Sequence, residues 1–197
     1  MKRTFDVIVA LSSLLLLAPV FLAIAIWVRL DSHGPVFFRQ ERVGRNGRSF
    51  RICKFRTMHV QSERAGPQIT IGQDVRITQA GKTLRAYKVD ELPQLWNVLC
   101  GNMSLVGPRP EVPDYVAIYP PEIRDRVLSV RPGITDPASI EFFDEAALLA
   151  NADDPERHYR QVVLPRKLSV YCSYVDNHGF VSDLHILINT IFRIARH

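Results

Sequence analysis

Two adjacent carboxylates, Asp90 and Glu91, stand directly before an apolar run, with basic residues on either side of them in the chain. A carboxylate can attack phosphorus to form an acyl phosphate when cations neutralise the charge on the phosphate oxygens. The cations that suit this chemistry are Lys54, Arg56, Arg85 and Arg109. An Asp-Glu pair is also an ordinary acidic helix cap, because a helix N-terminus favours each ionised carboxylate by about 0.3–1 kcal/mol. The residues alone leave both interpretations open.

The common signatures of other enzyme classes are absent from the sequence. It contains no Walker loop, no Gly-x-Gly-x-x-Gly, no His-Glu-x-x-His and no Gly-x-Ser-x-Gly. The six histidines show no pairing at metal-ligand spacing. The three cysteines, Cys53, Cys100 and Cys172, are too far apart for a Cys-x-x-Cys site and odd in number for a disulfide framework. We therefore expect the soluble part to lie in a reducing compartment.

Length and composition favour one folded domain. The chain has 197 residues, of which 47% are apolar, and this excludes a disordered or fibrous protein. Residues 29–56 hold eight cations and two anions, a net charge of +6, so the rest of the chain sums to −1 within the total of +5. Such a basic block attracts nucleic acid, anionic lipid or a phosphorylated substrate, and charge alone does not choose among them.

Residues 7–28 form an uncharged, largely apolar stretch. A helix of this length is roughly 33 Å long, close to the thickness of a bilayer's hydrocarbon core. The basic block follows at once, so we expect a retained anchor rather than a cleaved signal peptide. Pro19 predicts a kink. Hydropathy by itself favours a single span with the body in the cytoplasm, whereas a sharp kink would return the helix to the leaflet it entered.

Local patterns predict a hairpin, a loop and several helices in the body. Residues 36–38 and 49–52 flank the turn Gly-Arg-Asn-Gly at 44–47, which predicts a short hairpin, and the polar residues 60–82 predict a surface loop or a lid. Apolar spacing predicts a helix over 92–99 with Asp90 as its N-cap. Prolines predict stiff turns at 104–110 and 131–135.

Three further helices are expected towards the C-terminus. They cover residues 114–128, with an interruption at Pro120-Pro121, residues 155–175 and residues 181–196. The last is strongly apolar and ends in basic residues. It suits a membrane surface and the protein core equally well.

Six blocks in a fixed order resemble the bacterial sugar transferases known as small monotopic phosphoglycosyl transferases. They are Lys-Arg-Thr-Phe-Asp at 2–6, Gly-Pro-Val-Phe-Phe-Arg-Gln at 34–40, Lys-Phe-Arg-Thr-Met at 54–58, Asp-Glu-Leu-Pro-Gln-Leu at 90–95, Asn-Val-Leu-Cys-Gly-Asn-Met-Ser-Leu-Val-Gly-Pro-Arg-Pro at 97–110 and Arg-Pro-Gly-Ile-Thr at 131–135. The likeness covers nearly the whole chain, and the length matches the minimal form of the family.

The resemblance implies an enzyme that transfers a sugar 1-phosphate from a UDP-sugar to polyprenol phosphate, usually undecaprenyl phosphate, and releases UMP. This is the first membrane step in assembling a capsule, exopolysaccharide, O-antigen or glycoprotein glycan. The resemblance implies that Asp90 is the nucleophile of a covalent phosphosugar-aspartate intermediate and that Glu91 binds Mg²⁺. The phosphate or substrate contacts that it implies are Lys54, Arg56, Arg85, Arg109 and, with a less defined role, Asp183.

The resemblance also implies how the chain is organised. Residues 1–33 would be a re-entrant helix-break-helix, broken at Ala18 and Pro19, that does not cross the bilayer. Residues 34–197 would be a compact cytosolic catalytic domain, mainly helical α+β, with interfacial amphipathic helices at the cytoplasmic face of the bacterial inner membrane. The implied partners are the UDP-sugar, polyprenol phosphate and inner-membrane lipid, without nucleic acid. The sugar, the pathway and the oligomeric state, a homo-oligomer included, stay open.

The chain departs from the family pattern at two places. Ala18 stands where members often have serine before the proline, so a hydroxyl that can bond a freed carbonyl is missing. Residues 136–143, Asp-Pro-Ala-Ser-Ile-Glu-Phe-Phe, replace a segment that in many members begins Gly-Trp-Ala-Gln and later carries an arginine. Our hypothesis for this change is a different sugar preference. The competing hypothesis for the whole chain is a membrane-anchored basic binding or scaffold protein, whose binding would weaken steeply with salt.

Overall fold

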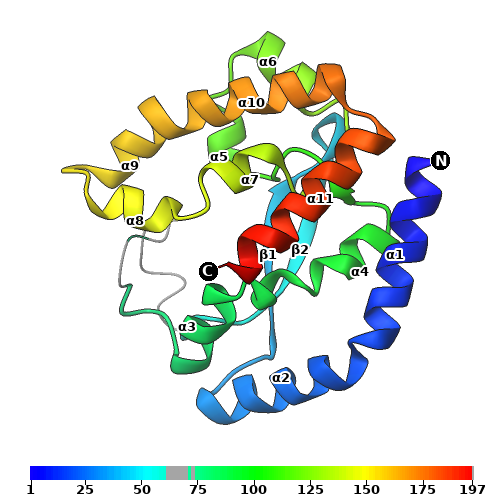
Figure 1. The fold of residues 1–197 in the computed structure, drawn as a ribbon. Helices are drawn as coiled ribbons and strands as arrows, with labels where there is room; N and C mark the ends of the chain where they lie inside the picture. Colours follow the sequence, from blue (N-terminus) through cyan, green and yellow to red (C-terminus); the bar gives the residue numbers. More distant parts are fainter. Residues whose placement is uncertain (61–70, 72–73, 197) are drawn as a thin grey trace.

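The computed structural model describes residues 1–60, 71 and 74–196. It is mainly helical with two small two-stranded sheets, which confirms the predicted class (Figure 1). The α-helices are α1 (Lys2–Leu16), α2 (Ala18–Asp31), α3 (Gln79–Ala86), α4 (Gln94–Leu99), α5 (Pro113–Val116), α6 (Pro121–Val127), α7 (Pro137–Glu141), α8 (Glu145–Ala150), α9 (Pro155–His158), α10 (Leu164–Asn177) and α11 (Phe180–Ala195). The strands and short helical turns are β1 (Phe37–Val43), η1 (Arg45–Gly47), β2 (Ser49–Phe55), η2 (Val89–Glu91), β3 (Ser104–Val106), β4 (Gly133–Thr135) and η3 (Tyr159–Val163).

The apolar N-terminal stretch forms two helices rather than one. α1 and α2 meet at Leu17 with a bend of 62°, one residue before the predicted break at Ala18 and Pro19. Pro19 lies in the first turn of α2, where its missing N–H costs no helical hydrogen bond. Within the described residues no helix taken singly has the length and hydropathy to cross a bilayer, whereas the bent pair together meets both criteria.

Both outer ends of this helix pair are bonded to the body. At the start of α1, the Lys2 ammonium donates to the Val106 carbonyl at 3.0 Å and the Arg3 guanidinium to the Val98 carbonyl at 2.7 Å. At the end of α2, the Arg56 guanidinium donates to the Val28 carbonyl at 3.3 Å. These bonds cross the predicted domain boundary at residue 33, and the division itself stays a prediction.

The predicted hairpin is present and longer than expected. β1 and β2 pair antiparallel over seven residues each, with Phe38 opposite Lys54 and Arg42 opposite Phe50. The Asn-Gly corner is confirmed as well. Asn46 has φ 57° and Gly47 has φ 74°, the left-handed conformation that asparagine and glycine tolerate best.

The stiff turns predicted at 104–110 and 131–135 each contain a short strand. β3 and β4 pair in parallel, Ser104 opposite Gly133 and Val106 opposite Thr135. Beyond β3, a Cβ on Gly107 would lie 2.4 Å from the Arg131 carbonyl oxygen, so the close approach of the two segments requires glycine. The prediction of turns over these strand residues was wrong, because the pairing of parallel strands depends on a partner segment that is distant in sequence.

The remaining elements largely follow the predicted pattern. Pro120 separates α5 from α6, and the predicted helices at 155–175 and 181–196 appear as α9–η3–α10 and as α11. The predicted loop over 60–82 falls mostly outside the described residues. The predicted end of this loop at residue 82 was wrong, because α3 already starts at Gln79. The Thr78 hydroxyl accepts a hydrogen bond from the Gly81 N–H at 3.0 Å, and this N-cap starts the helix.

The hydrophobic core consists of clusters that join these elements. In Figure 1, α6 and α10 lie at one end of the molecule and α2 at the other, with the hairpin between them. One cluster unites α5, α6 and α10, and includes Tyr115, Val127 and Leu168. A second joins α1 to α4 and β3, and includes Ala10 and Val98. The first helix of the N-terminal pair is therefore packed against the strand that leads to the Gly-Pro-Arg-Pro segment.

Candidate active site

The Asp90-Glu91 pair lies on the turn η2, between α3 and α4. Lys88 before it is left-handed, with φ 54°, and Leu92 and Pro93 after it continue the turn into α4. The prediction that Asp90 caps the helix was therefore wrong, because α4 begins only at Gln94. The Leu95 N–H bonds back to the Leu92 carbonyl at 3.0 Å, so the tight turn extends the chain before the α-helix starts.

Asn97 on α4 fixes this turn against the hairpin. Its amide Nδ2 donates to the Arg51 carbonyl at 2.8 Å, and its Oδ1 accepts from the Cys53 N–H at 2.9 Å. Both bonds are to β2, the strand that carries Lys54. Because α4 follows η2 directly, these bonds hold Glu91 within reach of Lys54.

Glu91 is the centre of a buried group of charges. Its Oε1 lies 2.6 Å from the Lys54 ammonium, and its Oε2 accepts from Arg109 Nη1 at 3.1 Å, while Arg109 Nη2 also donates to Oε1. The side chains of Glu91 and Lys54 are each 16% exposed. Burial by itself raises the pKa of Glu91, but Arg109 and Lys54 together hold that pKa well below its ordinary value. Glu91 is therefore ionised at neutral pH.

The environment of Asp90 shifts its pKa in the opposite direction to that of Glu91. It is 7% exposed, and its carboxylate makes no hydrogen bond or ion pair with any residue the structure describes. Burial first, and then the adjacent Glu91 charge, raise the pKa of Asp90 from 3.8 to about 6, against the opposing effect of Lys54 and Arg85. A carboxylate with a raised pKa and no partner is a better nucleophile than one neutralised by an ion pair.

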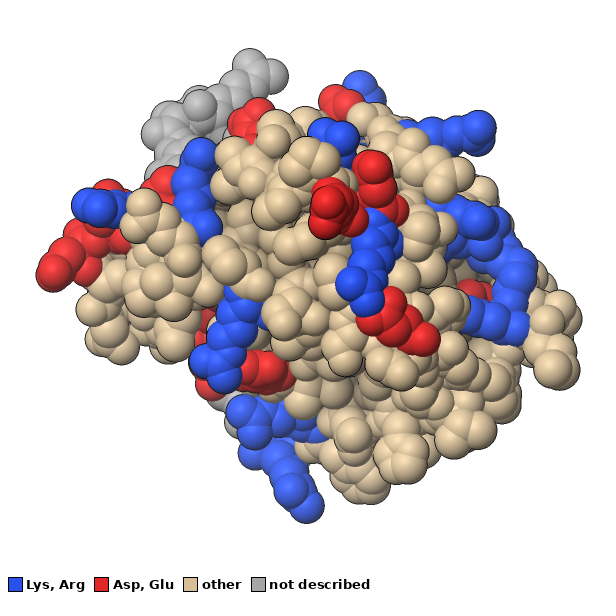
Figure 2. Space-filling model, turned by 90° about the horizontal axis from the view of Figure 1, so that it is seen from above, with Lys and Arg blue, Asp and Glu red and all other residues tan. Residues whose placement is uncertain are grey.

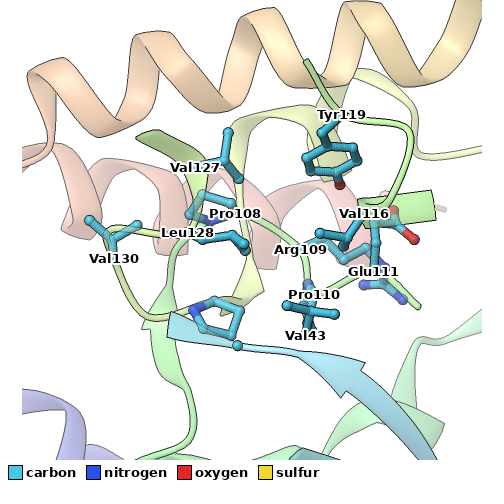
Figure 3. A pocket seen from close by; sticks show the side chains of 12 residues that line it. Val43, Pro108, Arg109, Pro110, Glu111, Val116, Tyr119, Val127, Leu128 and Val130 are labelled. Carbon is cyan, nitrogen blue, oxygen red and sulfur yellow. The ribbon is translucent and has the colours of Figure 1, made fainter. Parts of the chain in front are cut away.

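Arg109 reaches this group from a rigid segment. Pro108 and Pro110 flank it, and the Pro108 carbonyl accepts from the Gly133 N–H at 3.0 Å. Arg109 lines a small cavity, shown in Figure 3. Tyr119 and the apolar side chains Val127, Leu128 and Val130 also line it. Its volume is about 10 Å³. That suffices for a single water at most, so it is not a substrate site.

Arg109 also borders a much larger cleft, of about 1580 Å³. Asp90, Glu91, Lys54, Arg85 and Arg109 all line it. Arg85 projects from α3, and its Nε donates to the Thr57 hydroxyl at 2.9 Å. The structure therefore brings together five of the residues that the sequence singled out, two carboxylates and three cations from four separate segments.

Arg56 and Asp183, the other two predicted contacts, do not line the cleft. The Arg56 guanidinium is buried and donates to the Pro35 carbonyl at 2.6 Å and to the Ser32 hydroxyl at 2.5 Å. Asp183 is 5% exposed and pairs with Lys2, and it accepts from the Tyr174 hydroxyl at 2.7 Å. These two side chains hold the ends of the N-terminal helix pair to the body.

A family model described as bacterial sugar transferase matches residues 1–197. The chain belongs to the bacterial sugar transferase family. This sugar transferase is 38% identical over 198 residues to exopolysaccharide production protein PSS of Rhizobium leguminosarum bv. phaseoli, covering 97% of this chain and 93% of that one.

Two further relatives carry names that specify a reaction. The UDP-N-acetylgalactosamine-undecaprenyl-phosphate N-acetylgalactosaminephosphotransferase of Aeromonas hydrophila is 43% identical over 192 residues, which are 96% of this sugar transferase but 42% of the relative. The UDP-glucose:undecaprenyl-phosphate glucose-1-phosphate transferase of Caulobacter vibrioides is 37% identical over 195 residues, 96% of this chain and 68% of the relative. This sugar transferase thus spans less than half of the Aeromonas protein.

The Mg²⁺ that the resemblance implies needs oxygen ligands in the cleft. Across the parts of the chain that the structure describes, no three His, Cys, Asp or Glu side chains are grouped to hold a metal ion. Mg²⁺ is commonly held by one or two carboxylates together with substrate phosphates and water. Glu91, with Asp90 beside it, fits that donor set if substrate phosphates take over the hydrogen bonds of Lys54 and Arg109.

The sequence patterns did not single out the side chains that support this site in the sugar transferase. Asn97 is one of them. A second group lies behind Arg109, where buried Glu111 accepts from the Tyr159 hydroxyl at 2.9 Å and is 3.5 Å from the Arg42 guanidinium. The available signal was position in the sequence, because Asn97 is the first residue of the recognised block at 97–110 and Glu111 directly follows that block. Their partners lie 44 and 48 residues away and could not be inferred locally.

Proposed function

We propose that this protein transfers a sugar 1-phosphate from a UDP-sugar to a polyprenol phosphate such as undecaprenyl phosphate, with release of UMP. The names of the relatives from Aeromonas and Caulobacter support this reaction. Those names specify different sugars, so the proposal leaves the sugar unassigned. In the cell this is a first membrane step of bacterial glycoconjugate assembly, and the Rhizobium relative named for exopolysaccharide production supports that assignment.

The proposed reaction has two displacement steps at one phosphorus. An Asp90 carboxylate oxygen attacks the β-phosphorus, the bond from that phosphorus to the bridging oxygen breaks, and UMP leaves with the electron pair. A polyprenol phosphate oxygen then attacks the same phosphorus and releases the Asp90 carboxylate, giving polyprenol diphosphate sugar. Lys54, Arg85 and Arg109 neutralise the charge on the phosphate oxygens. A Mg²⁺ held by Glu91 would stabilise the same charge when bound.

The single observation that carries this proposal is the contrast between the two adjacent carboxylates. Glu91 is neutralised by two cations, whereas Asp90 is buried, has a pKa of about 6 and lines the cleft without a hydrogen-bonding partner among the described residues. A helix cap would have accepted backbone N–H bonds. Asp90 accepts none in the described structure, so the capping interpretation loses its support.

We further propose that α1 and α2 enter the membrane from the cytoplasmic side and return to it. Two observations support re-entry: the 62° bend, and the bonds that tie Lys2 and Val28, at opposite ends of the pair, to the same body. The apolar side chains that the pair exposes are Ile8, Leu11, Leu15, Leu16, Val20, Leu22, Ile26, Trp27 and Leu30. An apolar surface of this extent requires a lipid or protein cover.

The proposed reaction is tested with the full chain in detergent or nanodiscs, supplied with polyprenol phosphate and a panel of UDP-sugars. UMP release from one donor is expected, and it should disappear in Asp90→Asn. Incubation with that donor alone should add the mass of a phosphosugar to Asp90. Product formation that continues in Asp90→Asn, or without any adduct on Asp90, would contradict the covalent mechanism.

The topology is tested separately by placing a single cysteine beside Lys2 and labelling intact cells and inverted vesicles. Re-entry predicts that the thiol reacts only from the cytoplasmic side. Labelling from the periplasmic side alone would show a helix that crosses the membrane.

The alternative of a basic binding or scaffold protein depends on an exposed cationic surface. Arg56 is buried, and Lys54 and Arg42 have their ammonium and guanidinium groups in ion pairs, so part of the basic block faces inwards. On the face in Figure 2, Lys and Arg side chains are distributed over several places, and Asp and Glu lie beside several of them. Binding that weakens steeply with salt and persists in Asp90→Asn would favour this alternative.

A further inference from the structure

One face of strand β1 contributes a row of three side chains to the cleft. They are Phe38, Gln40 and Arg42, which alternate along the strand and therefore share a face. On β2, Lys54 is directly opposite Phe38 and lines the cleft as well. Gln40 and Lys54 are thus diagonal neighbours in the hairpin, a relationship that places two residues about 7–8 Å apart and within reach of long side chains. Gln40 therefore lies beside the cation that pairs with Glu91.

The orientation of the Gln40 amide is set by Arg42. Arg42 Nη2 donates to Gln40 Oε1 at 2.6 Å. A guanidinium carries donors only, so its partner in an amide must be the oxygen and not the nitrogen. The bond therefore leaves both hydrogens of Gln40 Nε2 for another acceptor.

Gln40 Nε2 has no acceptor within the protein as described. It makes no hydrogen bond with any residue that the structure describes. Across the same residues, the buried side-chain polar atoms that lack a hydrogen bond are Arg42 Nε, Gln94 Nε2 and the Tyr171 hydroxyl oxygen. Gln40 Nε2 is not one of these, so it is accessible. An accessible amide donor in a cleft can bind an oxygen atom of a ligand.

Arg42 is in turn held by the segment that carries Arg109. Arg42 Nη1 donates to the Pro110 carbonyl at 3.1 Å and lies 3.5 Å from the Glu111 carboxylate. Burial lowers the pKa of Arg42, Glu111 opposes this effect, and the charge of Arg109 lowers the pKa further. The Arg42 guanidinium is therefore near Arg109. Through Arg42, the amide of Gln40 is fixed relative to both the hairpin and the Arg109 segment.

We propose that Gln40 Nε2 donates a hydrogen bond to a non-bridging oxygen of the β-phosphate of the UDP-sugar, the phosphate that Asp90 attacks. This inference rests on the proposed function and adds a substrate-binding residue to it. The neighbours of the amide support a phosphate as its acceptor, because Lys54 lies beside it and Arg109 lies in the segment that holds Arg42. The amide is neutral, so it stabilises negative charge on the phosphate without adding a cation that could pair with the Asp90 carboxylate.

The first test compares the binding of UDP and UMP to the purified full chain in detergent, because UDP has the β-phosphate and UMP lacks it. Gln40→Met removes the amide and keeps the length of the side chain without adding a charge. A hydrogen bond to a charged group corresponds to roughly a 10- to 150-fold effect on affinity. We expect Gln40→Met to weaken UDP binding about tenfold or more and UMP binding by less than about threefold.

A second variant separates loss of the donor from loss of the fold. Gln40→Met leaves Arg42 Nη2 without its acceptor and should lower the urea midpoint. Gln40→Glu keeps an oxygen for Arg42 and removes only the donor. Its urea midpoint should equal or exceed that of the wild type, whereas kcat/KM for the UDP-sugar should fall about tenfold or more.

Gln161→Glu is the matched control for this variant. Gln161 Oε1 also accepts from an arginine, Arg157 Nε at 3.1 Å, but Gln161 is exposed and does not line the cleft. The two substitutions make the same chemical change beside an arginine. Gln161→Glu should therefore leave kcat/KM within about twofold of the wild type.

Three results would overturn the proposal. Unchanged UDP binding in Gln40→Met would show that the amide does not bind the β-phosphate, and equal weakening of UDP and UMP would place its effect on the rest of the nucleotide or on the fold. A kcat/KM of Gln40→Glu equal to that of the Gln161 control would remove Gln40 from the reaction.

The proposed function has a separate measurement, UMP release from a UDP-sugar by the wild type. If that release is present and the Gln40 variants bind and turn over like the wild type, the inference about Gln40 fails alone. If the wild type releases no UMP while its UDP binding depends on Gln40, the phosphate contact stands and the proposed function fails.

Discussion

The Lys54 ammonium lies 2.6 Å from Glu91 Oε1, although the two residues are 37 positions apart in the chain. This ion pair and the bonds from Arg109 stabilise the Glu91 carboxylate, whereas the Asp90 carboxylate has no ion pair with any residue that the structure describes. The two neighbours therefore have opposite pKa shifts and, in the proposed reaction, different tasks.

Replacing Asp90 with asparagine should abolish UMP release and raise stability. The folded-state pKa of Asp90 is raised from 3.8 to about 6, so ionising it costs folding free energy at every pH above about 6. Each unit corresponds to about 1.4 kcal/mol, so removing the charge should stabilise the fold by about 2–3 kcal/mol at pH 7. Urea unfolding of the two proteins measures this difference, and a destabilised Asp90→Asn would contradict it.

Asp74→Asn is the matched control for that measurement. Asp74 is also an aspartate lining the cleft, but its hydrogen bonds from Arg76 lower its pKa. Its contribution to stability is present at neutral pH and is lost as the pH falls through the lowered value. Asp74→Asn should therefore lower the urea midpoint, the opposite of the effect at Asp90.

The rate should fall on the acid side with an apparent pKa near 6. Attack requires the ionised Asp90, and protonation removes the nucleophile as the pH drops through the pKa of about 6. The measurement is kcat/KM for the UDP-sugar between pH 4.5 and 8, with circular dichroism at each pH to show that the fold persists. A profile that stays flat down to pH 4.5 in a folded protein would exclude Asp90 as a group with this pKa.

Replacing Glu91 with glutamine should destabilise the protein, although the change is chemically the same as that at Asp90. It leaves the Lys54 and Arg109 cations without their shared anion, and breaking a buried pair in this way costs about 3 kcal/mol. The pKa of Glu91 is held low in the folded protein, so its ionised form stabilises the fold at neutral pH. Glu91→Gln removes this stabilisation. A stability equal to that of the wild type at pH 7 would show that the three charges do not interact as the structure has them.

Removal of Mg²⁺ with EDTA should stop UMP release, and added Mg²⁺ should restore it. The reason is the proposed role of Glu91, whose single carboxylate leaves the remaining ligands to phosphate and water. Conservative replacement by aspartate keeps the charge but shortens the reach, so Glu91→Asp should need more Mg²⁺ for half-maximal rate. Full activity in EDTA after prior chelation would remove the metal from the mechanism.

Arg56 and Arg109 should respond differently to replacement by lysine, although the sequence singled out both for substrate contact. Arg109 lines the cleft, so loss of its bidentate fork should reduce kcat/KM for the UDP-sugar about tenfold or more. Arg56 bonds to Pro35 and Ser32 outside the cleft, so Arg56→Lys should lower the melting temperature and change kcat/KM by less than about threefold. A larger kinetic effect at Arg56 than at Arg109 would reverse this assignment.

Local chemistry in the sequence was enough to predict several elements. The Asn-Gly corner at 46–47, the interruption at Pro120 and the apolar spacing of α11 act over a few residues, so their outcome does not depend on the rest of the fold. The ordered motifs likewise identified the family, which the match over residues 1–197 confirms.

The tertiary structure alone decided which charges meet. The resemblance assigns different roles to Asp90 and Glu91, but no local pattern shows that their environments differ. They differ because Lys54 on β2 and Arg109 after β3 both reach Glu91. Arg56 is two residues from Lys54, but β2 ends at Phe55, and beyond the strand the Arg56 guanidinium bonds to Val28 and Ser32 at the end of α2. Contacts between distant segments depend on how whole elements pack, and no local pattern specifies that.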